Sequence, residues 1–519
     1  MTANDLVRTG IEGLDAILLG GIPRNNVILV QGSMGSGKTL LGLEFIYRGI
    51  TQFNEPGMVV VFETSPDKII RDAAGFGWNL QELQQQKKLQ IIFTTPQVFD
   101  QELRSPHSLL LETAAEIGAR RIFVDGIGLL SPTPAGESPK PHTGASGYRE
   151  LLQQLIEALR RQNLTAMLSH ELSAFPHLLS TSEMAGFLAD TVIQLNRYPR
   201  NRQSLRSIEI VKSRGQRYTT GEHTLHISEN KGLQVFRRVQ APLRLNLSQP
   251  TSIRRSSIGV EVLDTLIGGG IFDGSTTMVI GVSGVGKTVL GTQLLREGAA
   301  KQGKRGLLIS LDEHPAQIIR NAETIGLNLK EQVDSDTIHI LFESPQELDV
   351  DKHYAEIVAL IEKHDIQRMV VDGMTSYSTA LEDPGIYRDF FHALVAYTKQ
   401  RLMTTFFNYE NPEFLGVSSY MPDFPVSSIV DNIILLSIVE LNNSLHRCLT
   451  VVKARGSNHE FDTREYVIGQ GGIKLLPKDR DAAETLPFQN YSSLLSRAPT
   501  RLSMPRRVNG AATAPNPRP

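Results

Sequence analysis

Short runs of consecutive apolar residues alternate along the chain with longer segments in which apolar residues recur every three or four positions. The runs include NVILVQG at 26–32, MVVVFE at 58–63, RRIFVDG at 120–126 and TAMLSH at 165–170. Runs of this length are typical of strands buried on both faces, and the longer period is typical of helices that cover such strands. The alternation predicts an α/β fold, a mostly parallel sheet with flanking helices.

The clearest helical pattern is YRELLQQLIEALRRQNL at 148–164. Five apolar residues fall on one face of this predicted helix: Leu151, Leu152, Leu155, Ile156 and Leu159. It follows SPTPAGESPKPHTGASG at 131–147, where four prolines and three glycines predict a long loop.

The pattern occurs twice. Residues 10–49 and 259–298 align without a gap at an offset of 249, with 16 identities in 40 positions. The offset falls to 247 where RRIFVDG matches QRMVVDG, and to 241 where VKSRG matches VKARG. Matches in the same order along both halves indicate a tandem duplication of one domain, with insertions in its loops.

The duplication divides the chain into four parts. We predict a first domain over 1–240, a linker over 241–257, a second domain over 258–485, and a terminal loop with a flexible basic tail over 486–519. The segment 237–257 has five arginines, two prolines and no acid, which is typical of a linker. From residue 497 onward there are five arginines, five prolines and no acid.

Composition and charge exclude several classes of protein. The single cysteine, Cys448, excludes an intrachain disulfide and a multi-cysteine metal site. The net charge of −2 disfavours nucleic acid as a partner. No apolar run reaches the roughly 18 residues of a membrane helix, and MTANDLVRTGIEGLD lacks the features of a signal peptide. We therefore expect a cytoplasmic protein without a membrane partner.

Two phosphate loops carry the strongest chemical signal. GSMGSGKT at 32–39 and GVSGVGKT at 281–288 each follow an apolar run and precede a helical pattern, the context this motif requires. We expect Lys38 and Lys287 to reach the β- and γ-phosphates of ATP, on a loop whose backbone amides wrap the phosphates. The predicted contacts are Gly35, Ser36, Gly37, Lys38, Thr39 and Leu40 in the first copy, and Ser283, Gly284, Val285, Gly286, Lys287, Thr288 and Val289 in the second.

Magnesium and a catalytic base require further oxygen ligands and carboxylates. Asp125 and Asp372 end predicted strands and, with Thr39 and Thr288, are the predicted Mg²⁺ ligands. The candidate catalytic carboxylates follow the second strand of each copy and are Glu63 in FETSP, and Asp312 and Glu313 in LDEHP. Acids after strands also serve as turn formers or surface groups, and this alternative stays open.

Alternating cations recur near the end of each copy. VKSRG contains Lys212, Ser213 and Arg214, and VKARG contains Lys453 and Arg455. In a strand, alternate side chains share a face, so each pair of cations could clamp a triphosphate, including one bound by a neighbouring subunit. The alternative is a solvated strand face.

Taken together, these segments resemble the KaiC family of circadian-clock ATPases and autokinases, within the RecA-like superfamily. The resemblance rests on TGIEGLD, both phosphate loops, FETSPDKIIRDAAGFGWNL, both K-x-R-G segments and FQNYSSLLSRAPTRL at 488–502. It implies two RecA-like domains that stack as rings of a homohexamer, with ATP and Mg²⁺ between subunits. It also implies ATP hydrolysis in the first domain, and serine/threonine autokinase activity in the second.

The resemblance assigns roles to individual residues. Glu63, Asp312 and Glu313 match catalytic glutamates, although Thr64 replaces one of them and Asp312 is shortened by one methylene. Ser427 and Ser428 match the family's phosphorylated pair, with serine in place of threonine at the second position. Further matches to nucleotide contacts are Arg447, Lys453, Arg455, Ser457 and His459, together with Lys212 and Arg214, whereas Tyr218 stands where a histidine is usual.

The two copies differ at the predicted phosphoacceptors. In register with Ser427 and Ser428, the first copy has Gly186 and Phe187, and only the second copy has two adjacent acids. We expect the first copy to hydrolyse ATP, and the second also to phosphorylate itself.

The resemblance further implies a role in circadian or stress-type signalling, with a KaiB-like protein or a response regulator or histidine kinase as partner. The segment MPRRVNGAATAPNPRP replaces the family's tail, which argues against activation by KaiA. Two other functions remain open. One is a non-catalytic, ATP-dependent signalling scaffold, and the other is a RecA- or DnaB-like nucleic-acid motor, which the arginines of the linker and tail would suit.

Overall fold

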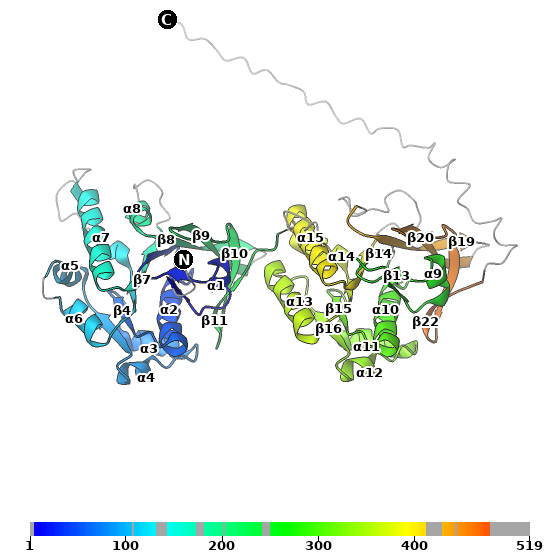
Figure 1. Ribbon diagram of the computed structural model, residues 1–519, viewed down its shortest axis with the longest axis horizontal. Coiled ribbons are helices and arrows are strands. Elements are labelled where there is room, and N and C mark those ends of the chain that lie inside the picture. The colour runs from blue at the N-terminus through cyan, green and yellow to red at the C-terminus, as the bar shows by residue number, and fades with distance from the viewer. Residues whose placement is uncertain are drawn as a thin grey trace, which may run out of the picture.

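The computed structural model describes residues 5–105, 108–130, 143–172, 181–200, 203–240, 250–411, 428–441 and 444–477. Within them, two nine-stranded sheets lie side by side, each with its own helices (Figure 1). This architecture confirms the predicted α/β fold and the tandem duplication.

The first sheet has the strand order β11-β10-β9-β8-β3-β7-β6-β4-β5. The six strands from β8 to β5 are parallel, and β9, β10 and β11 extend them in antiparallel fashion. The strands are β3 (Val27–Gly32), β4 (Gly57–Val61), β5 (Leu89–Phe93), β6 (Arg121–Asp125), β7 (Thr165–Glu171), β8 (Thr191–Arg200), β9 (Gln203–Ser213), β10 (Glu222–Ser228) and β11 (Gly232–Phe236).

The second sheet repeats this order strand for strand, from β22 through β14 to β16. Its strands are β14 (Thr276–Gly281), β15 (Gly306–Ser310), β16 (Ile338–Phe342), β17 (Arg368–Asp372), β18 (Thr404–Glu410), β19 (Asn432–Leu441), β20 (Ser444–Ala454), β21 (Arg464–Gly469) and β22 (Gly472–Leu475). A two-stranded ribbon precedes each sheet, β1 (Leu6–Val7) with β2 (Ile22–Pro23), and β12 (Arg255–Ser256) with β13 (Ile271–Phe272).

Most helices connect the parallel strands, whereas the first helix of each copy lies between the two strands of its ribbon. Those of the first copy are α1 (Leu14–Ile17), α2 (Lys38–Phe53), α3 (Pro66–Ala74), α4 (Leu80–Gln85), α5 (Pro96–Arg104), α6 (Leu109–Glu116), the 3₁₀ turn η2 (Ile127–Leu130), α7 (Thr143–Arg161) and α8 (Thr181–Leu188). Those of the second are α9 (Glu261–Leu266), α10 (Lys287–Gln302), α11 (Pro315–Thr324), α12 (Leu329–Asp334), α13 (Val350–His364), α14 (Met374–Leu381) and α15 (Pro384–Gln400).

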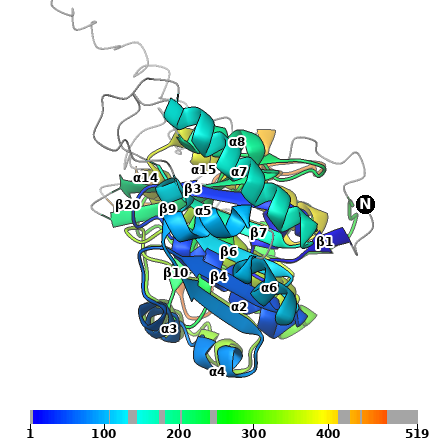
Figure 2. The ribbon, with the colours of Figure 1, turned by 90° about the vertical axis from the view of Figure 1, so that its left-hand side faces the viewer.

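Each sheet is buried on both faces. Alternate residues of β3 enter different cores, Ile28 and Val30 on the side of α2, and Val27 and Leu29 on the side of α7. Figure 2 shows these two helices on opposite sides of the first sheet. The apolar face predicted for 148–164 is buried in this second core, so that prediction is confirmed.

Two boundaries differ from the sequence prediction. Helix α7 begins at Thr143, so the last five residues of the predicted loop 131–147 are helical. They extend a helix whose apolar stripe packs on the sheet. Arg255 and Ser256, assigned to the linker, form β12. The guanidinium of Arg255 lies over the ring of Phe272, 4.0 Å from its centroid, and ties this segment to the second copy.

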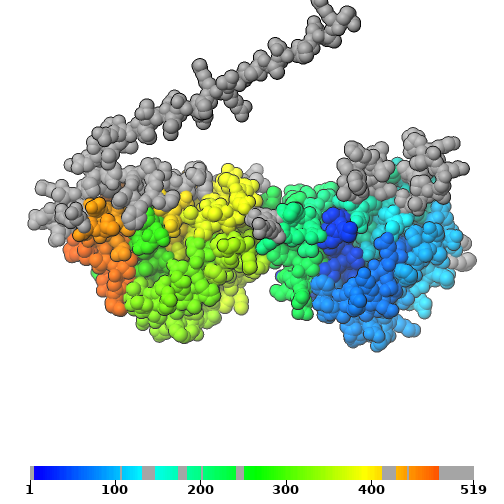
Figure 3. All heavy atoms as spheres, turned by 180° about the vertical axis from the view of Figure 1, so that it is seen from behind, coloured from blue at the N-terminus to red at the C-terminus, as the bar shows by residue number. Residues whose placement is uncertain are grey.

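The two copies meet where β10 and the end of the first domain face α13, and Figure 3 shows the contact as a narrow waist. Thr224 donates a hydrogen bond to Asp351 (2.9 Å), and the backbone amide of Val239 donates another (2.8 Å). His226 lies 3.0 Å from Asp349. Within the described residues, no helix has both the length and the apolar character needed to cross a membrane.

Candidate nucleotide and phosphoacceptor sites

Each phosphate loop joins the end of a central strand to the start of a long helix. Gly284 (φ +75°) and Gly286 (φ +105°) have left-handed backbone conformations, as do Gly35 (φ +74°) and Gly37 (φ +106°) in the first copy. Residues with a Cβ rarely adopt these backbone angles. A Cβ at Gly286 would also lie 2.7 Å from a methyl group of Ile468. The glycines of the motif are therefore required by the shape of the loop.

The lysine of each loop folds back over it. The Nζ of Lys287 donates to the carbonyls of Gly281 and Val282, at 2.8 Å each. Lys38 makes the equivalent bonds to Gly32 and Ser33, at 2.9 Å each. Burial lowers the pKa of both lysines, while nearby carboxylates act in the opposite direction. A phosphate bound in either loop would accept these hydrogen bonds from the lysine ammonium in place of the carbonyls.

A threonine and an aspartate meet beside each loop. Thr288 donates to one carboxylate oxygen of Asp372 (2.5 Å), and Thr39 donates to Asp125 (2.9 Å). A hydroxyl and a carboxylate are hard oxygen donors, the type that Mg²⁺ prefers, and the arrangement fits that ion. The predicted metal ligands of each copy are thus adjacent.

The second oxygen of each aspartate is held by the neighbouring strand. Asn408 in β18 donates to Asp372 (3.0 Å), and Ser169 in β7 donates to Asp125 (2.5 Å). No sequence motif marks these two residues. They occupy the same position in TAMLSHE and TTFFNYE, so a residue-by-residue comparison of the two copies would have found them.

In the second copy, the phosphate loop opens into a cavity of about 340 Å³. The cavity brings together the predicted residues Lys287, Thr288, Asp312, Glu313 and Asp372. It also includes Glu410, the last residue of β18, which sequence analysis missed. Its counterpart in the first copy, Glu171, ends β7.

The two adjacent acids of this cavity differ in environment. Asp312 is exposed and accepts a hydrogen bond from Ser376 (2.5 Å). Glu313 is half-buried and accepts one from Asn321 (3.2 Å). Burial, and then the charge of Asp372, raise the pKa of Glu313. A raised pKa is the property expected of a general base, so Glu313 is the better candidate of the two.

The first copy has a single acid at this place. Glu63 follows β4 and is exposed, and the next residue, Thr64, is half-buried. The charges of the Glu171 and Asp125 carboxylates raise the pKa of Lys38, against the effect of burial. Two acids in addition to Glu63 therefore lie near this end of the sheet.

The K-x-R cations lie away from the phosphate loop of their own chain. Lys453 donates to the carbonyl of Val430 (2.7 Å), and Arg455 donates to the carbonyl of Ser428 (3.4 Å). In the first copy, Lys212 donates to the carbonyls of Gly186 (2.9 Å) and Ala189 (2.6 Å), and Arg214 to that of Phe187 (3.0 Å). The cations hold the segment that precedes β8 or β19.

The other residues assigned by resemblance belong to the same region. Arg447 lies in β20, and Ser457 accepts a hydrogen bond from Arg255 (2.7 Å). The ring of His459 packs on that of Phe461, with centroids 4.5 Å apart. None of these three residues lines the cavity at the second phosphate loop.

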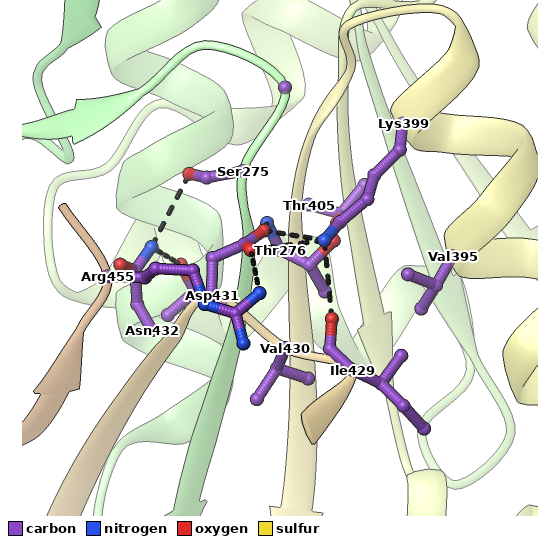
Figure 4. Close-up of polar contacts among 12 residues, drawn as sticks. Ser275, Thr276, Val395, Lys399, Thr405, Ile429, Val430, Asp431, Asn432 and Arg455 are labelled. Carbon is purple, nitrogen blue, oxygen red and sulfur yellow. Dashed lines mark hydrogen bonds and ion pairs between the residues drawn. The ribbon is translucent and has the colours of Figure 1, made fainter. Parts of the chain in front are cut away.

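Asp431 organises the segment that contains the predicted phosphoacceptors (Figure 4). Its carboxylate accepts from the backbone amide of Thr276 (2.9 Å) and lies 2.9 Å from the ammonium of Lys399. Arg455 approaches the same carboxylate at 3.4 Å. Ser428 is exposed, and Ser427 lies outside the described residues.

Asp190 repeats this arrangement in the first copy. It accepts from the amide of Val27 (3.0 Å) and pairs with Arg160 (3.0 Å). The aspartate is therefore part of the shared fold. The hydroxyl-bearing residues in front of it are a feature of the second copy alone.

The described part of the predicted phosphoacceptor segment, residues 428–431, lies at the opposite end of β14 from the phosphate loop. Asp431 binds the amide of Thr276, the first residue of this strand, whereas Lys287 binds the carbonyl of Gly281, the last. At about 3.3 Å per residue, the two ends are separated by roughly 17 Å. Within one chain, the phosphate loop and Ser428 therefore cannot meet.

Comparison with known proteins identifies the family. A sequence model of the KaiC ATPase matches residues 7–240 and again 256–480. The circadian clock oscillator protein KaiC of Picosynechococcus sp. is 32% identical over 500 residues, 96% of this chain and 93% of the relative. Its namesake from Thermostichus vulcanus is 32% identical over 510 residues, 98% and 94% of the two chains. The circadian clock oscillator protein KaiC 1 of Synechocystis sp. is 31% identical over 500 residues, 96% and 92%. With two matched repeats, two RecA-like sheets and two phosphate loops, this chain belongs to the KaiC family of ATPases.

Proposed function

We propose that this chain forms a homohexamer that binds ATP with Mg²⁺ at both phosphate loops. The first copy hydrolyses ATP, and the second also transfers the γ-phosphate to Ser427 and Ser428 of a neighbouring subunit. Lys38 and Lys287 bind the phosphates, and Thr39 with Asp125 and Thr288 with Asp372 hold the metal ion. Lys212, Ser213, Arg214, Arg447, Lys453, Arg455, Ser457 and His459 contact the nucleotide of the adjacent subunit.

One observation carries this proposal. The phosphoacceptor segment and the phosphate loop lie at opposite ends of β14. In a ring of subunits, the phosphoacceptor end of one chain can face the phosphate-loop end of the next. Such an arrangement would also bring Lys453 and Arg455 to the nucleotide, because both contact the phosphoacceptor segment.

The transfer balances with the residues of the cavity. A serine oxygen forms a bond to the γ-phosphorus, the bond between this phosphorus and the β–γ bridging oxygen breaks, and ADP leaves. Glu313 accepts the proton of the serine hydroxyl, which its raised pKa favours. In the first copy, water is the attacking group, because Gly186 and Phe187 stand where Ser427 and Ser428 stand in the second copy. Glu63 orients this water.

The names of the relatives are those of circadian clock proteins, and we propose that this chain acts in circadian or stress-type signalling. A KaiB-like protein, a response regulator or a histidine kinase would serve as partner. The segment MPRRVNGAATAPNPRP at 504–519, which lies outside the described residues, differs from the family's tail, so activation by KaiA is not part of this proposal.

Mixed oligomers test the transfer between subunits. A Lys287→Ala chain keeps both serines but has a disabled second phosphate loop, and a Ser427→Ala/Ser428→Ala chain has the loop but no serines. Each should remain unlabelled when incubated alone with γ-labelled ATP. When the two are mixed and reassembled, label should appear on the Lys287→Ala chain, which a size tag distinguishes on a gel.

The other outcomes discriminate among the alternatives. Label that requires both features in one chain would refute transfer between subunits. A wild-type chain that assembles with ATP but forms neither phosphoserine nor ADP would be a signalling scaffold. ATP turnover that depends on single-stranded nucleic acid, with binding that weakens steeply with salt, would indicate a motor.

A further inference from the structure

Two imidazoles and one carboxylate meet at the edge of the second sheet, outside the nucleotide cavity. Asp336 lies in the turn between α12 and β16, His339 lies in β16, and His364 is the last residue of α13. His339 is the second residue of its strand, so the group lies toward the amino ends of the parallel strands. The phosphate loop lies at their carboxyl ends.

The polar atoms of the three side chains face one another without forming hydrogen bonds. The carboxylate oxygens of Asp336 lie 3.6 Å from Nδ1 of His339 and 3.6 Å from Nδ1 of His364. This distance is too long for a hydrogen bond. It is close to the spacing of about 3.4 Å between two ligands of a tetrahedral ion with bonds of about 2.1 Å. One potential ligand atom from each side chain lies within 4.8 Å of the other two.

The histidines are held in place, whereas the carboxylate is open to solvent. The side chains of His339 and His364 are each 14% exposed, and their ring centroids are 3.8 Å apart. Nε2 of His339 is buried and has no hydrogen-bond partner in the described part of the chain. The side chain of Asp336 is 69% exposed, which gives an ion a route to the rings. Nδ1 of His339 faces Asp336 at 3.6 Å, too far for a hydrogen bond, and is the nitrogen that an ion between the three side chains would meet.

From this geometry, we propose that Asp336, His339 and His364 bind a divalent transition-metal ion of the Zn²⁺ type. Two imidazoles and a carboxylate suit zinc, cobalt or nickel, and three protein ligands leave a further position for water. A metal ion binds the neutral form of each imidazole.

The first copy of the duplication shows that the fold does not require this group. Lys87, Gln90 and Ile117 occupy the equivalent positions there, at the offsets of 249 and 247. The turn is the same, because Lys87 (φ +53°) and Asp336 (φ +58°) both have left-handed backbones. Packing and turn geometry are thus satisfied without metal-binding side chains. All three donors occur together only in the second copy.

Two local charges limit the expected affinity. The guanidinium of Arg305 donates to the backbone carbonyl of His364 (3.1 Å), and the charges of Arg305 and Lys363 both act on His339. Positive charges oppose a bound cation. A second group, Glu343, His353 and Glu356, also gathers three potential ligands. There the ammonium of Lys352 lies 3.6 Å from Glu356, so this carboxylate already has a cationic partner in place of a metal ion.

Calorimetric titration of the full chain with Zn²⁺ tests the proposal. The protein is first stripped with a chelator, and excess Mg²⁺ with ATP occupies the phosphate loops. The variants are Asp336→Asn, which changes only an exposed side chain, and His339→Gln, which installs the residue of the first copy. His446→Gln is the matched control, because His446 faces a single carboxylate, that of Glu465, at 2.8 Å. Co²⁺ is titrated in parallel, since its absorption reports nitrogen and oxygen coordination.

The wild-type chain should bind one equivalent of Zn²⁺ that the control retains. Asp336→Asn should weaken this event by about tenfold or more, and His339→Gln should abolish it. Melting temperatures measured without metal should be the same in the wild type and Asp336→Asn, which shows that the fold is intact. An isotherm unchanged by Asp336→Asn and His339→Gln, or the absence of any wild-type binding event, would overturn the proposal. Neither result depends on phosphate transfer.

Discussion

Thr288, at the start of α10, donates a hydrogen bond of 2.5 Å to Asp372, at the end of β17. The two residues are 84 positions apart in the chain. The pair Thr39 and Asp125 repeats the contact in the first copy at 2.9 Å. The contact pre-assembles two oxygen donors beside each phosphate loop, so a metal ion would meet both at once.

Replacing Thr288 with alanine should therefore weaken binding of Mg·ATP at the second copy. We expect a loss of about 10–100-fold in affinity, with little effect on ATP alone. The measurement is a titration with a fluorescent ATP analogue, with and without Mg²⁺, in a Lys38→Ala background that silences the first copy. Equal Mg²⁺ dependence in the Lys38→Ala protein and in the Lys38→Ala/Thr288→Ala protein would show that the Thr288 hydroxyl is not a metal ligand.

Glu313→Gln should preserve ATP binding and reduce phosphate transfer by about 10²–10⁴-fold, the usual contribution of a general base. Asp312→Asn should have a smaller effect, because the Asp312 carboxylate already accepts the Ser376 hydroxyl (2.5 Å). Single-turnover labelling from γ-labelled ATP measures both. An Asp312→Asn variant with the larger defect would reverse the assignment of the base.

The acidic limb of the pH–rate profile for phosphate transfer gives an independent check on the role of Glu313. A base acts in its ionised form, and burial raises the pKa of Glu313 above its ordinary value. Phosphate transfer should therefore fall, as the pH is lowered, at a higher pH than an ordinary glutamate would give. Rates across the acidic range, measured on preassembled protein, show where this limb lies. A limb at the ordinary pKa of a glutamate would argue against the role.

The ion pair between Lys399 and Asp431 should stabilise the phosphoacceptor segment. Both side chains are largely buried, 19% and 17% exposed, and Lys399 also donates to the carbonyl of Ile429 (3.3 Å). Lys399→Met should destabilise the second domain by about 2 kcal/mol, below the range for fully buried pairs. It should also increase amide hydrogen exchange at the start of β19.

The first copy supplies the control for this change. Arg160 makes the equivalent pair with Asp190, but its side chain is 49% exposed. Solvent screening makes such a pair weaker, so Arg160→Met should cost well under half as much. Thermal melts and hydrogen exchange of the two variants can be compared directly. A larger effect from Arg160→Met would mean that burial does not determine the strength of these pairs.

Asp351 should make the contact between the copies sensitive to pH. Burial raises the pKa of its carboxyl to about 6, even though Thr224 and the amide of Val239 donate to it. The folded protein then holds a proton that the unfolded chain releases near pH 4. Stability from this group is therefore present below pH 4 and is lost as the pH rises to about 6.

Asp351→Asn removes this titration. Its amide oxygen can accept from Val239, and the hydroxyl of Thr224 can rotate to accept from its nitrogen. The difference in melting temperature between variant and wild type should grow in favour of the variant from pH 4 to 6, and then remain constant. A difference that does not change over this range would contradict the raised pKa.

Much of the fold could be predicted from local patterns. The apolar runs became β3, β4, β6 and β7, and the stripe over 148–164 became the buried face of α7. Both phosphate loops have the backbone that their glycines indicate. These features depend on residues close together in sequence, so a short window contains the information.

Other parts of the site depended on neighbouring strands. Asn408 and Ser169 hold the aspartates Asp372 and Asp125, and Glu410 lines the cavity, yet no local motif marks them. They reach the site because β18 lies beside β17, and β7 beside β6, in the sheet order. That order is a property of the whole domain.

The sequence by itself determined that the chain is a duplicated α/β ATPase with two phosphate loops, because repeated motifs and apolar periods are local signals. Only the tertiary structure decided that the predicted phosphoacceptor segment lies at the far end of β14 from the phosphate loop. It alone also brought Asp336, His339 and His364 together from a turn, a strand and a helix. The contact of Asp431 with Thr276, and that of His364 with Asp336, join residues that are distant in sequence, and packing of the helices on the sheet fixes them.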